Sequence, residues 1–327
     1  MSFGTLRDRL PVLPPRGDSE ASWPRIGRGG NSFSDDLALP DGRRLGVRVR
    51  ITDRPSSGYE IDLRDCDADP SGRFGLSEER TRVAALLAIA DALGSVAHAG
   101  WAERIELLTE RGTFIGADEP DDAGAVALAM ARVYDAVLGA LGMAWPGRVG
   151  AGSCSLGTAV ELRAGDEVLL TEVLPGGEGG RPDRPGASAW AGPILGDDWP
   201  ATPSLDGVVI EGQLRDGSGG MGKRYGGDGV IRRYRAQRPL LARLAFDRVS
   251  NPPHGIDRAG PPRGTEVTLH LPGVERARSV EPFTTLELPT GATLVVETCG
   301  GAGWGFPGYG EIEWDPGEWF GSKPKGS

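Results

Sequence analysis

Glycine and proline divide the second half of this chain into short segments, and that spacing limits what it can fold into. The 327 residues include 52 glycines and 26 prolines, about twice the usual combined share. After Pro146 no stretch keeps a helical pattern, since each interior glycine costs a helix about 1 kcal/mol. Short alternating segments separated by Gly, Pro, Asn or Asp predict many β-strands there instead.

Two amphipathic stretches in the first half predict helices, over residues 76–94 and 121–142. The first has Ser77 as an N-cap candidate and Gly94 as its stop. The second has Pro120 near its start and Gly142 near its end, the usual placement of these two residues. Alternation of apolar and polar residues predicts strands at 45–52, 56–65 and 102–112.

The sequence of the second half predicts only strands. A strand pair turns at Gly165–Asp166, and further strands are predicted within residues 205–216, 228–236, 240–249, 264–271 and 283–300. The expected fold class is therefore α+β and β-rich: a mixed helix–strand first half followed by a mostly antiparallel β second half with long Gly-rich loops. We expect an N-terminal arm (1–40), an α+β domain (41–150) and a β-rich domain with glycine loops (151–327).

Charge and segment length exclude several classes of protein. A net charge of −10 argues against nucleic acid as a partner, because phosphate binding needs clustered Lys and Arg. The basic residues Arg232, Arg233 and Arg235 are expected on a solvated strand edge. The N-terminus lacks the apolar region of a signal peptide, and no apolar run predicts a membrane span. Three scattered cysteines fit a reducing cytoplasm, so we expect a cytoplasmic protein.

The stretch RDGSGGMGKRYGGDG, residues 215–229, fits most of two nucleotide-binding patterns, the phosphate loop and the dinucleotide fingerprint. Both require a helix directly after the loop, whose N-terminus holds phosphate. Arg224 stands where the phosphate loop needs Ser or Thr, and the glycines that follow disfavour a helix. We therefore reject both nucleotide readings. The glycines are expected at positions of positive φ or of close approach between chains.

The same stretch resembles a motif of the hydantoinase B/oxoprolinase family. Gly217 is an insertion relative to that motif, and the usual Arg before Gly-Gly is absent. The motif loop comprises Asp216, Ser218, Gly219, Gly220, Gly222, Lys223, Arg224, Tyr225, Gly226, Gly227 and Gly229, with Arg224 as an extra residue.

A second segment, VVETCGGAGWGFP at 295–307, is similar to the C-terminal motif of the same family. Cys299 replaces its Pro and Phe306 replaces its Asp. The matching residues are Glu297, Thr298, Gly300, Gly301, Gly303, Trp304, Gly305 and Pro307. With the acidic strand followed by a helix, and the central Gly-Gly loop, the resemblance covers roughly residues 40–310.

The resemblance implies a partner. B-type chains of this family work with an A-type, ATPase-like chain that uses ATP to activate a carbonyl or lactam oxygen. The outcome is ring opening of a hydantoin or lactam, or carboxylation of a ketone. Family members carry a metal-binding part rich in His and Asp, and we expect this chain to start after it. Its histidines, His98, His254 and His270, are scattered and lack metal-ligand spacing. We expect no cofactor in this chain, and ATP and a divalent metal in partner subunits.

The implied function is an accessory or assembly subunit of a multi-subunit, ATP-dependent enzyme, similar to the small additional subunit of an acetophenone-carboxylase-type complex. Its partners would be A-type and full-length B-type chains. An alternative is a non-enzymatic protein-binding module on the same scaffold. A third hypothesis, an independent hydrolase, would use Cys154 or Cys299. Cys154 is interpreted as a buried thiol, and Cys299 as either an exposed thiol or, the favoured interpretation, a substitute for proline.

Two further features carry weaker hints. Four aspartates in DLRDCDAD, residues 62–69, offer oxygen ligands for Ca²⁺ or Mg²⁺, although a solvated acidic turn is the favoured interpretation. Loop tryptophans suggest a partner surface; they are Trp190, Trp199, Trp304, Trp314 and Trp319.

Overall fold

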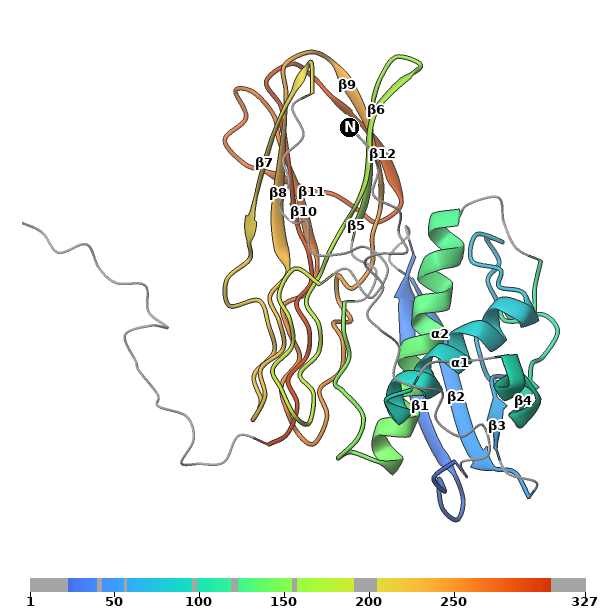
Figure 1. The fold of residues 1–327 in the computed structure, drawn as a ribbon. Helices are drawn as coiled ribbons and strands as arrows, with labels where there is room; N and C mark the ends of the chain where they lie inside the picture. The colour runs from blue at the N-terminus through green and yellow to red at the C-terminus, as the bar shows by residue number, and fades with distance from the viewer. Residues whose placement is uncertain are drawn as a thin grey trace, which may run out of the picture.

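The computed structural model describes residues 23–39, 43–55, 58–95, 99–118, 123–154, 158–190 and 205–306. Several residues singled out in the sequence lie outside these ranges: His98, Pro120, Trp199, Pro307, Trp314 and Trp319. The described part of the chain forms a helix-covered sheet beside a tall β-sandwich (Figure 1).

The N-terminal sheet has the strand order β1-β2-β3-β4. Its strands are β1 (Asn31–Ala38), β2 (Arg44–Asp53), β3 (Tyr59–Asp62) and β4 (Ile105–Leu108). The β1–β2 and β2–β3 pairs are antiparallel, whereas β3 and β4 are parallel. A parallel pair needs a long crossover, which here contains helix α1 (Glu78–Leu93) and the 3₁₀ helix η2 (Ala99–Arg104).

Helix α1 begins and ends where the sequence predicts. The Ser77 side chain accepts a hydrogen bond from the Arg80 N–H, which satisfies one free donor of the first turn. Gly94 adopts the left-handed conformation, with φ 60°, and its N–H returns to the last carbonyls of the helix.

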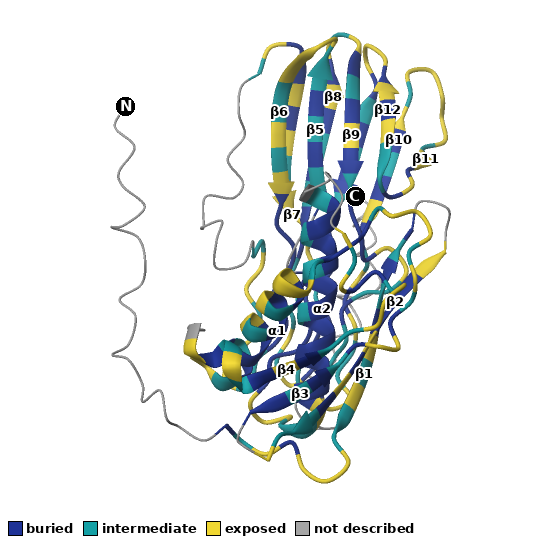
Figure 2. Cartoon of the chain, turned by 90° about the vertical axis from the view of Figure 1, so that its right-hand side faces the viewer, coloured by how far each residue is buried: buried dark blue, intermediate teal, exposed yellow. Residues whose placement is uncertain are grey.

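Helix α2 (Ala123–Ala144) packs against α1, β1 and β2. It continues two residues past Gly142, which lies near its end as predicted. A Cβ at Gly142 would lie 2.9 Å from the Ile256 Cδ1, so close packing accounts for the glycine. The stretch Gly124–Ala144 is long and apolar enough to span a membrane by composition alone, but 78% of its apolar window is buried within the fold. Figure 2 shows α2 in dark blue over most of its length.

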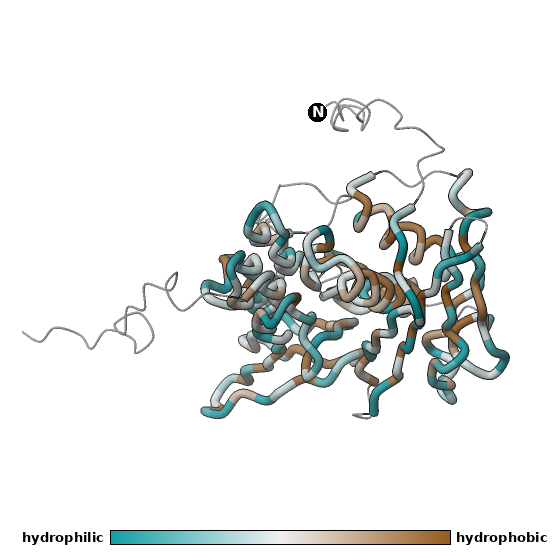
Figure 3. The backbone as a smooth tube through the Cα atoms, turned by 90° about the horizontal axis from the view of Figure 1, so that it is seen from below, coloured by the Kyte–Doolittle hydropathy of each residue, from teal (hydrophilic) through white to brown (hydrophobic). Residues whose placement is uncertain are grey.

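The β-sandwich consists of two antiparallel sheets. One has the order β12-β9-β5-β6, from Thr284–Leu288, Leu240–Ala245, Thr158–Ala164 and Glu167–Leu174. The other has the order β11-β10-β13-β8-β7, from Arg278–Ser279, Glu266–His270, Thr293–Glu297, Val230–Ala236 and Val208–Leu214. Both sheets contribute to one apolar core, because side chains alternate between the two faces of each strand. Apolar residues lie along the helices and inner strands, and polar ones along the outer turns (Figure 3).

Two features differ from the sequence prediction. Residues 31–38 of the expected N-terminal arm form β1, which pairs with β2 along its whole length. Arg232 does not lie on a solvated edge: β8 is an inner strand, and Arg232 points into the sandwich with 1% of its surface exposed. There its guanidinium lies 2.8 Å from the Glu172 carboxylate, and the Tyr234 hydroxyl donates to the same group. A buried arginine needs such a partner.

Candidate functional site

The structure brings the two predicted glycine motifs together at the base of the sandwich. Arg224 and Trp304 exchange backbone hydrogen bonds of 2.9 Å in both directions. The Lys223 N–H donates to the Gly305 carbonyl at 2.9 Å, and the Gly220 N–H donates to the Gly301 carbonyl at 2.8 Å. The two motifs therefore form one structural unit, although about eighty residues of sequence separate them.

Backbone hydrogen bonds in the second motif repeat every three residues. Gly300 and Gly303 donate to Arg263 and Gly260, Gly301 and Trp304 to Gly227 and Arg224, and Ala302 and Gly305 to Gly152 and Ile256. Three residues per turn is the period of the polyproline II helix, which makes no internal hydrogen bonds. Two sides of the segment are each bonded to one neighbouring stretch, 260–263 and 224–227, and the third side is bonded to Gly152 and Ile256. We call the whole assembly the glycine bundle, and it comprises residues 150–154, 176–180, 186–190, 218–229, 256–263 and 299–305.

Most of the motif glycines are required because segments of the backbone approach one another closely at these positions. A Cβ at Gly301 would lie 1.9 Å from the Glu178 carbonyl oxygen, and a Cβ at Gly177 would lie 1.9 Å from that of Gly227. Both distances are far below van der Waals contact. Gly217 is different: it has open space around it and a φ of 70°, which a glycine adopts without strain. Residues 224–229 form no helix, so a phosphate loop's helix N-terminus is missing after Lys223.

The polar side chains of the motifs hold the backbone of the bundle. Ser218 and Thr298 are fully buried. The Ser218 hydroxyl accepts from the Gly229 N–H at 2.9 Å, and the Thr298 hydroxyl accepts from the Val230 N–H and donates to the Pro175 carbonyl. Asp216, by contrast, is exposed in a turn. Ser218 and Thr298 are therefore positioned to support the fold.

Arg215, just before the motif loop, is a buried cation that connects separate segments of the chain. Its guanidinium donates to the Gly264 and Thr298 carbonyls and pairs with the Glu266 carboxylate at 2.6 Å. Glu297 of the second motif lies 3.5 Å from the same guanidinium. The predicted residue Glu297 thus helps to balance a structural cation.

Glu178, in the central Gly-Gly loop, forms a buried junction that we did not predict. Its two carboxylate oxygens accept from the Arg184 guanidinium at 2.7 Å each. Arg181 lies 3.6 Å from the same carboxylate and reaches Asp91 of α1 at 2.6 Å. Asp91 also accepts from the Tyr134 hydroxyl of α2, and burial together with Asp91 raises the pKa of Tyr134 well above its usual value. The sequence signal for this junction was a single acidic residue, Glu178, among four glycines and followed by Arg181 and Arg184.

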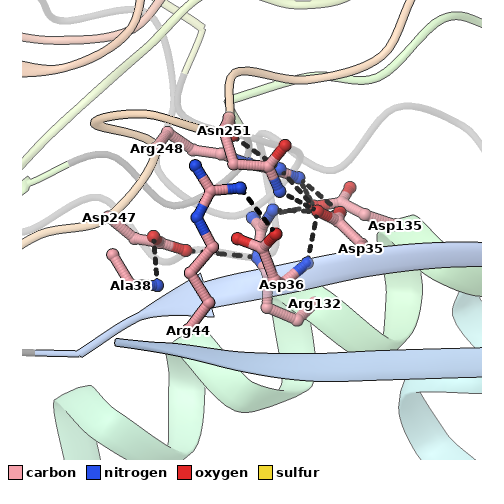
Figure 4. A network of polar contacts seen from close by, with 9 residues as sticks. All are labelled: Asp35, Asp36, Ala38, Arg44, Arg132, Asp135, Asp247, Arg248 and Asn251. Carbon is pink, nitrogen blue, oxygen red and sulfur yellow. Dashed lines mark hydrogen bonds and ion pairs between the residues drawn. The ribbon is translucent and has the colours of Figure 1, made fainter. Parts of the chain in front are cut away.

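A second buried network links the sheet-and-helix part to the sandwich (Figure 4). It contains three carboxylates and two guanidiniums, none with more than 5% of its side chain exposed. Asp35 comes from β1, Arg132 and Asp135 from α2, and Asp247 and Arg248 from the chain after β9.

The ions of this network pair at short distances, although one carboxylate oxygen of Asp135 and one of Asp247 accept no hydrogen bond. Arg248 donates to both oxygens of Asp35, at 2.9 and 2.8 Å, and to Asp135 at 2.8 Å. Arg132 lies 2.8 Å from Asp135, 3.2 Å from Asp35 and 3.4 Å from Asp247. Burial raises the pKa of Asp135 to about 8 and that of Asp247 to about 6, against the opposing effect of Arg132. Three acids facing two cations therefore favour one bound proton near neutral pH.

Within the described ranges, the cysteines and histidines form no nucleophilic site. Cys154 and Cys299 are buried and free, so the exposed reading of Cys299 is wrong. The two cysteines flank Gly177. The Cys154 N–H donates to the Gly177 carbonyl, and the Gly177 N–H donates to the Cys299 carbonyl. Burial raises the pKa of Cys299 well above its usual value, and a hydrogen bond with Cys154 adds to this. His254 is half-buried, and desolvation of its ring lowers its pKa; His270 lies on β10.

Three of the four aspartates in residues 62–69 are engaged by their own neighbours, and Asp65 is exposed. Asp62 pairs with Arg64 at 2.7 Å, and Asp67 pairs with Arg48 at 2.5 Å. Asp69 accepts from the Phe74 N–H at 2.8 Å. No group of three His, Cys, Asp or Glu residues arranged for a metal occurs within the described ranges.

Sequence and structure comparisons give consistent results. The model of the hydantoinase B/oxoprolinase family matches residues 20–307. The 5-oxoprolinase 1 of Arabidopsis thaliana is 24% identical over 315 residues, or 92% of this chain and 24% of that protein. The ATP-dependent caprolactamase from Pseudomonas jessenii superposes with a TM-score of 0.64 at 17% identity, covering 85% of this chain and 52% of that chain.

Acetone carboxylase, in a nucleotide-free structure, superposes with a TM-score of 0.67 at 15% identity, covering 84% of this chain and 45% of that chain. At these identities the structural likeness concerns the fold. The chain spans about a quarter of the length of 5-oxoprolinase 1 and about half of each structural relative.

Proposed function

Since this chain belongs to the hydantoinase B/oxoprolinase family, we propose that it is an accessory or assembly subunit of a multi-subunit, ATP-dependent enzyme. The relatives named above include an ATP-dependent caprolactamase, an enzyme of ATP-dependent acetone carboxylation and a 5-oxoprolinase. The proposed reaction of the complex is therefore ring opening of a lactam or hydantoin, or carboxylation of a ketone. We place the complex in the cytoplasm.

One observation carries the accessory part of this proposal: the buried polar side chains in and beside the family motifs hold backbone groups. Ser218 and Thr298 are fully buried and bonded to main-chain groups, and Arg215 is bonded to two carbonyls. The motif glycines are set by chain packing. A motif used in this way supports a rigid scaffold.

The chemistry of the complex would then come from its partners. We propose an A-type, ATPase-like chain, which uses ATP to activate the carbonyl oxygen, and a full-length B-type chain that supplies the divalent metal. This chain would contribute the glycine bundle and the surfaces around it. A non-enzymatic binding module on the same scaffold is the second candidate, favoured by the exposed Met221 and Tyr225 on the bundle, 40% and 52% exposed.

Purification of the tagged chain from its native cells tests the proposal. We expect A-type and full-length B-type chains to be recovered in fixed ratio, stable to moderate salt. Recovery of unrelated proteins in fixed ratio would favour the binding module. Recovery of the chain by itself under mild conditions would contradict the subunit proposal.

A further inference from the structure

One end of the glycine bundle presents a small basic and apolar surface, which we call the tip surface: Met221, Lys223, Arg258 and Phe306. Its members meet through their backbones. The Gly260 N–H donates to the Met221 carbonyl at 2.6 Å, and the Lys223 N–H donates to the Gly305 carbonyl, one residue before Phe306. Met221 is 40% exposed and Phe306 37% exposed, and both cations are exposed.

The turn that carries Arg258 has an unfavourable backbone. Asp257 and Arg258 both lie in the left-handed region, with φ of 52° and 65°. The Ala259 N–H closes the turn on the Ile256 carbonyl at 3.3 Å. Two consecutive positive φ angles are normally taken by Gly or Asn, because a Cβ is strained there. A strained residue kept at the surface points to a use for its side chain.

The Arg258 side chain is held in place on the tip surface. Its guanidinium carbon lies 4.5 Å from the centroid of the Phe306 ring, in a cation–π arrangement. The stacked face is covered by the ring, while the donors at the edge of the planar guanidinium are suited to a carboxylate. The side chain is therefore ordered before any partner arrives, which lowers the entropy cost of docking.

Lys223 is the only lysine before residue 323, in a chain that otherwise uses arginine. Gly305 leaves room for its stem: a Cβ there would lie 3.1 Å from the Lys223 Cβ. The ammonium is thus carried by a backbone fixed on the bundle. Arg258, Met221 and Phe306 are of the residue types that are enriched in protein interfaces, and Lys223 adds a second cation beside them.

We propose that the tip surface docks an acidic segment of a partner chain in the complex, an inference that rests on the proposed function. Lys223 and Arg258 are exposed cations on a chain whose net charge is −10, so they form a local positive surface that complements an acidic segment. An acidic segment of a different chain pairs its carboxylates with Lys223 and Arg258. Its apolar side chains cover Met221 and Phe306.

Three variants separate docking from folding. Arg258→Gly removes the guanidinium and relieves the left-handed backbone, so it keeps or improves thermal stability. Asp257→Gly relieves the neighbouring residue of the same turn and keeps Arg258, which makes it the matched control. Lys223→Glu reverses the charge at an exposed position. We expect Arg258→Gly and Lys223→Glu each to weaken docking about tenfold or more, and Asp257→Gly to leave it intact.

The experiment is carbodiimide cross-linking of the tagged chain purified from its native cells, with mass spectrometry of the products. The reagent joins a lysine amine directly to a carboxylate in contact with it. We expect a Lys223 cross-link to an acidic segment of an A-type or B-type chain, lost in Arg258→Gly and kept in Asp257→Gly.

The remaining outcomes each decide a different point. Two results would overturn docking at the tip surface and leave the proposed function standing. One is recovery of both partners without a Lys223 cross-link. The other is recovery of the partners in equal amounts from all variants. A Lys223 cross-link to an unrelated chain, lost in Arg258→Gly, keeps the tip surface and overturns the proposed function. A cross-link to a second copy, including its residues 311–318, overturns the proposed occupant.

Discussion

Arg248 and Asp35 form a two-pronged ion pair, 2.9 and 2.8 Å long, between residues 213 positions apart in the sequence. The pair joins β1 to the chain that follows β9, and both side chains are at least 95% buried. It is therefore a fixed point between the helix-covered sheet and the sandwich. Asp135, on α2, accepts from the same guanidinium and extends the contact.

Removing one member of this pair is expected to destabilise the whole chain. Arg248→Met leaves Asp35 and Asp135 facing a single guanidinium, and an uncompensated buried charge costs about 3–5 kcal/mol. Arg64→Ala, which breaks a solvent-exposed pair with Asp62, is the control and is expected to change stability far less. Urea unfolding followed by circular dichroism measures both. Equal effects would show that the buried pair has no special weight.

Stability is expected to fall as the pH rises from about 7 to about 8. Asp135 has a folded pKa of about 8, above its usual value near 3.8. In this window the folded chain therefore holds a proton that the unfolded chain has released, and stability decreases with pH. The slope is at most about 1.4 kcal/mol per pH unit for one proton. His254, with a lowered pKa, titrates below this window.

The variant Asp135→Asn tests this assignment. It leaves two carboxylates facing two guanidiniums, so the slope between pH 7 and 8 is expected to disappear. Asp216→Asn, at an exposed position, should keep the wild-type slope. Thermal unfolding across a pH series gives the comparison. A slope that survives in Asp135→Asn places the proton on another group.

A methyl group at Gly301 is expected to disrupt the glycine bundle. The new Cβ would lie 1.9 Å from the Glu178 carbonyl oxygen, so the backbone segment at Gly301 or the one at Glu178 must shift. We expect a loss of at least about 3 kcal/mol, at the upper end for overpacking, or no folded product. Gly147→Ala, where nothing lies within 4 Å of the new Cβ, is expected to change stability by less than about 0.5 kcal/mol. Unfolding free energies of the two variants decide the matter.

The thiols are expected to be unreactive in the folded chain. Cys66, Cys154 and Cys299 are all buried, and burial raises the pKa of Cys66 to about 11 and that of Cys299 well above its usual value. Thiolate is the reactive form. Ellman's reagent should therefore detect the three thiols after denaturation and none before it. Rapid native reaction of one thiol, mapped to Cys299, would revive the hydrolase hypothesis.

Local signals were enough to predict most elements. Ser77 and Gly94 cap α1 as expected, because capping depends on residues within one turn. The turn at Gly165–Asp166 joins β5 and β6 for the same reason. The two family motifs were recognisable from glycine spacing, and the structure places them side by side.

Features that depend on distant partners could not be predicted in this way. β1 has the sequence NSFSDDLA, and its polar residues gave no strand pattern. Asp35 is buried there only because Arg132 and Arg248 reach it from other elements. Likewise, Arg232 looked like part of a basic surface until Glu172, on the facing sheet, supplied its partner. The three-residue period of residues 300–305 depends on hydrogen bonds to three other segments, so that segment by itself does not reveal it.

The most direct test of the accessory assignment is a turnover assay on the purified chain. The chain is supplied with ATP and Mg²⁺ and, in separate reactions, with hydantoin, 5-oxoproline, caprolactam, or acetophenone with bicarbonate. The prediction is that the chain shows no ATP hydrolysis and no product by itself, and that both appear when the A-type and full-length B-type chains are added. Turnover by the isolated chain, lost in a variant of one of its own residues, would contradict the account.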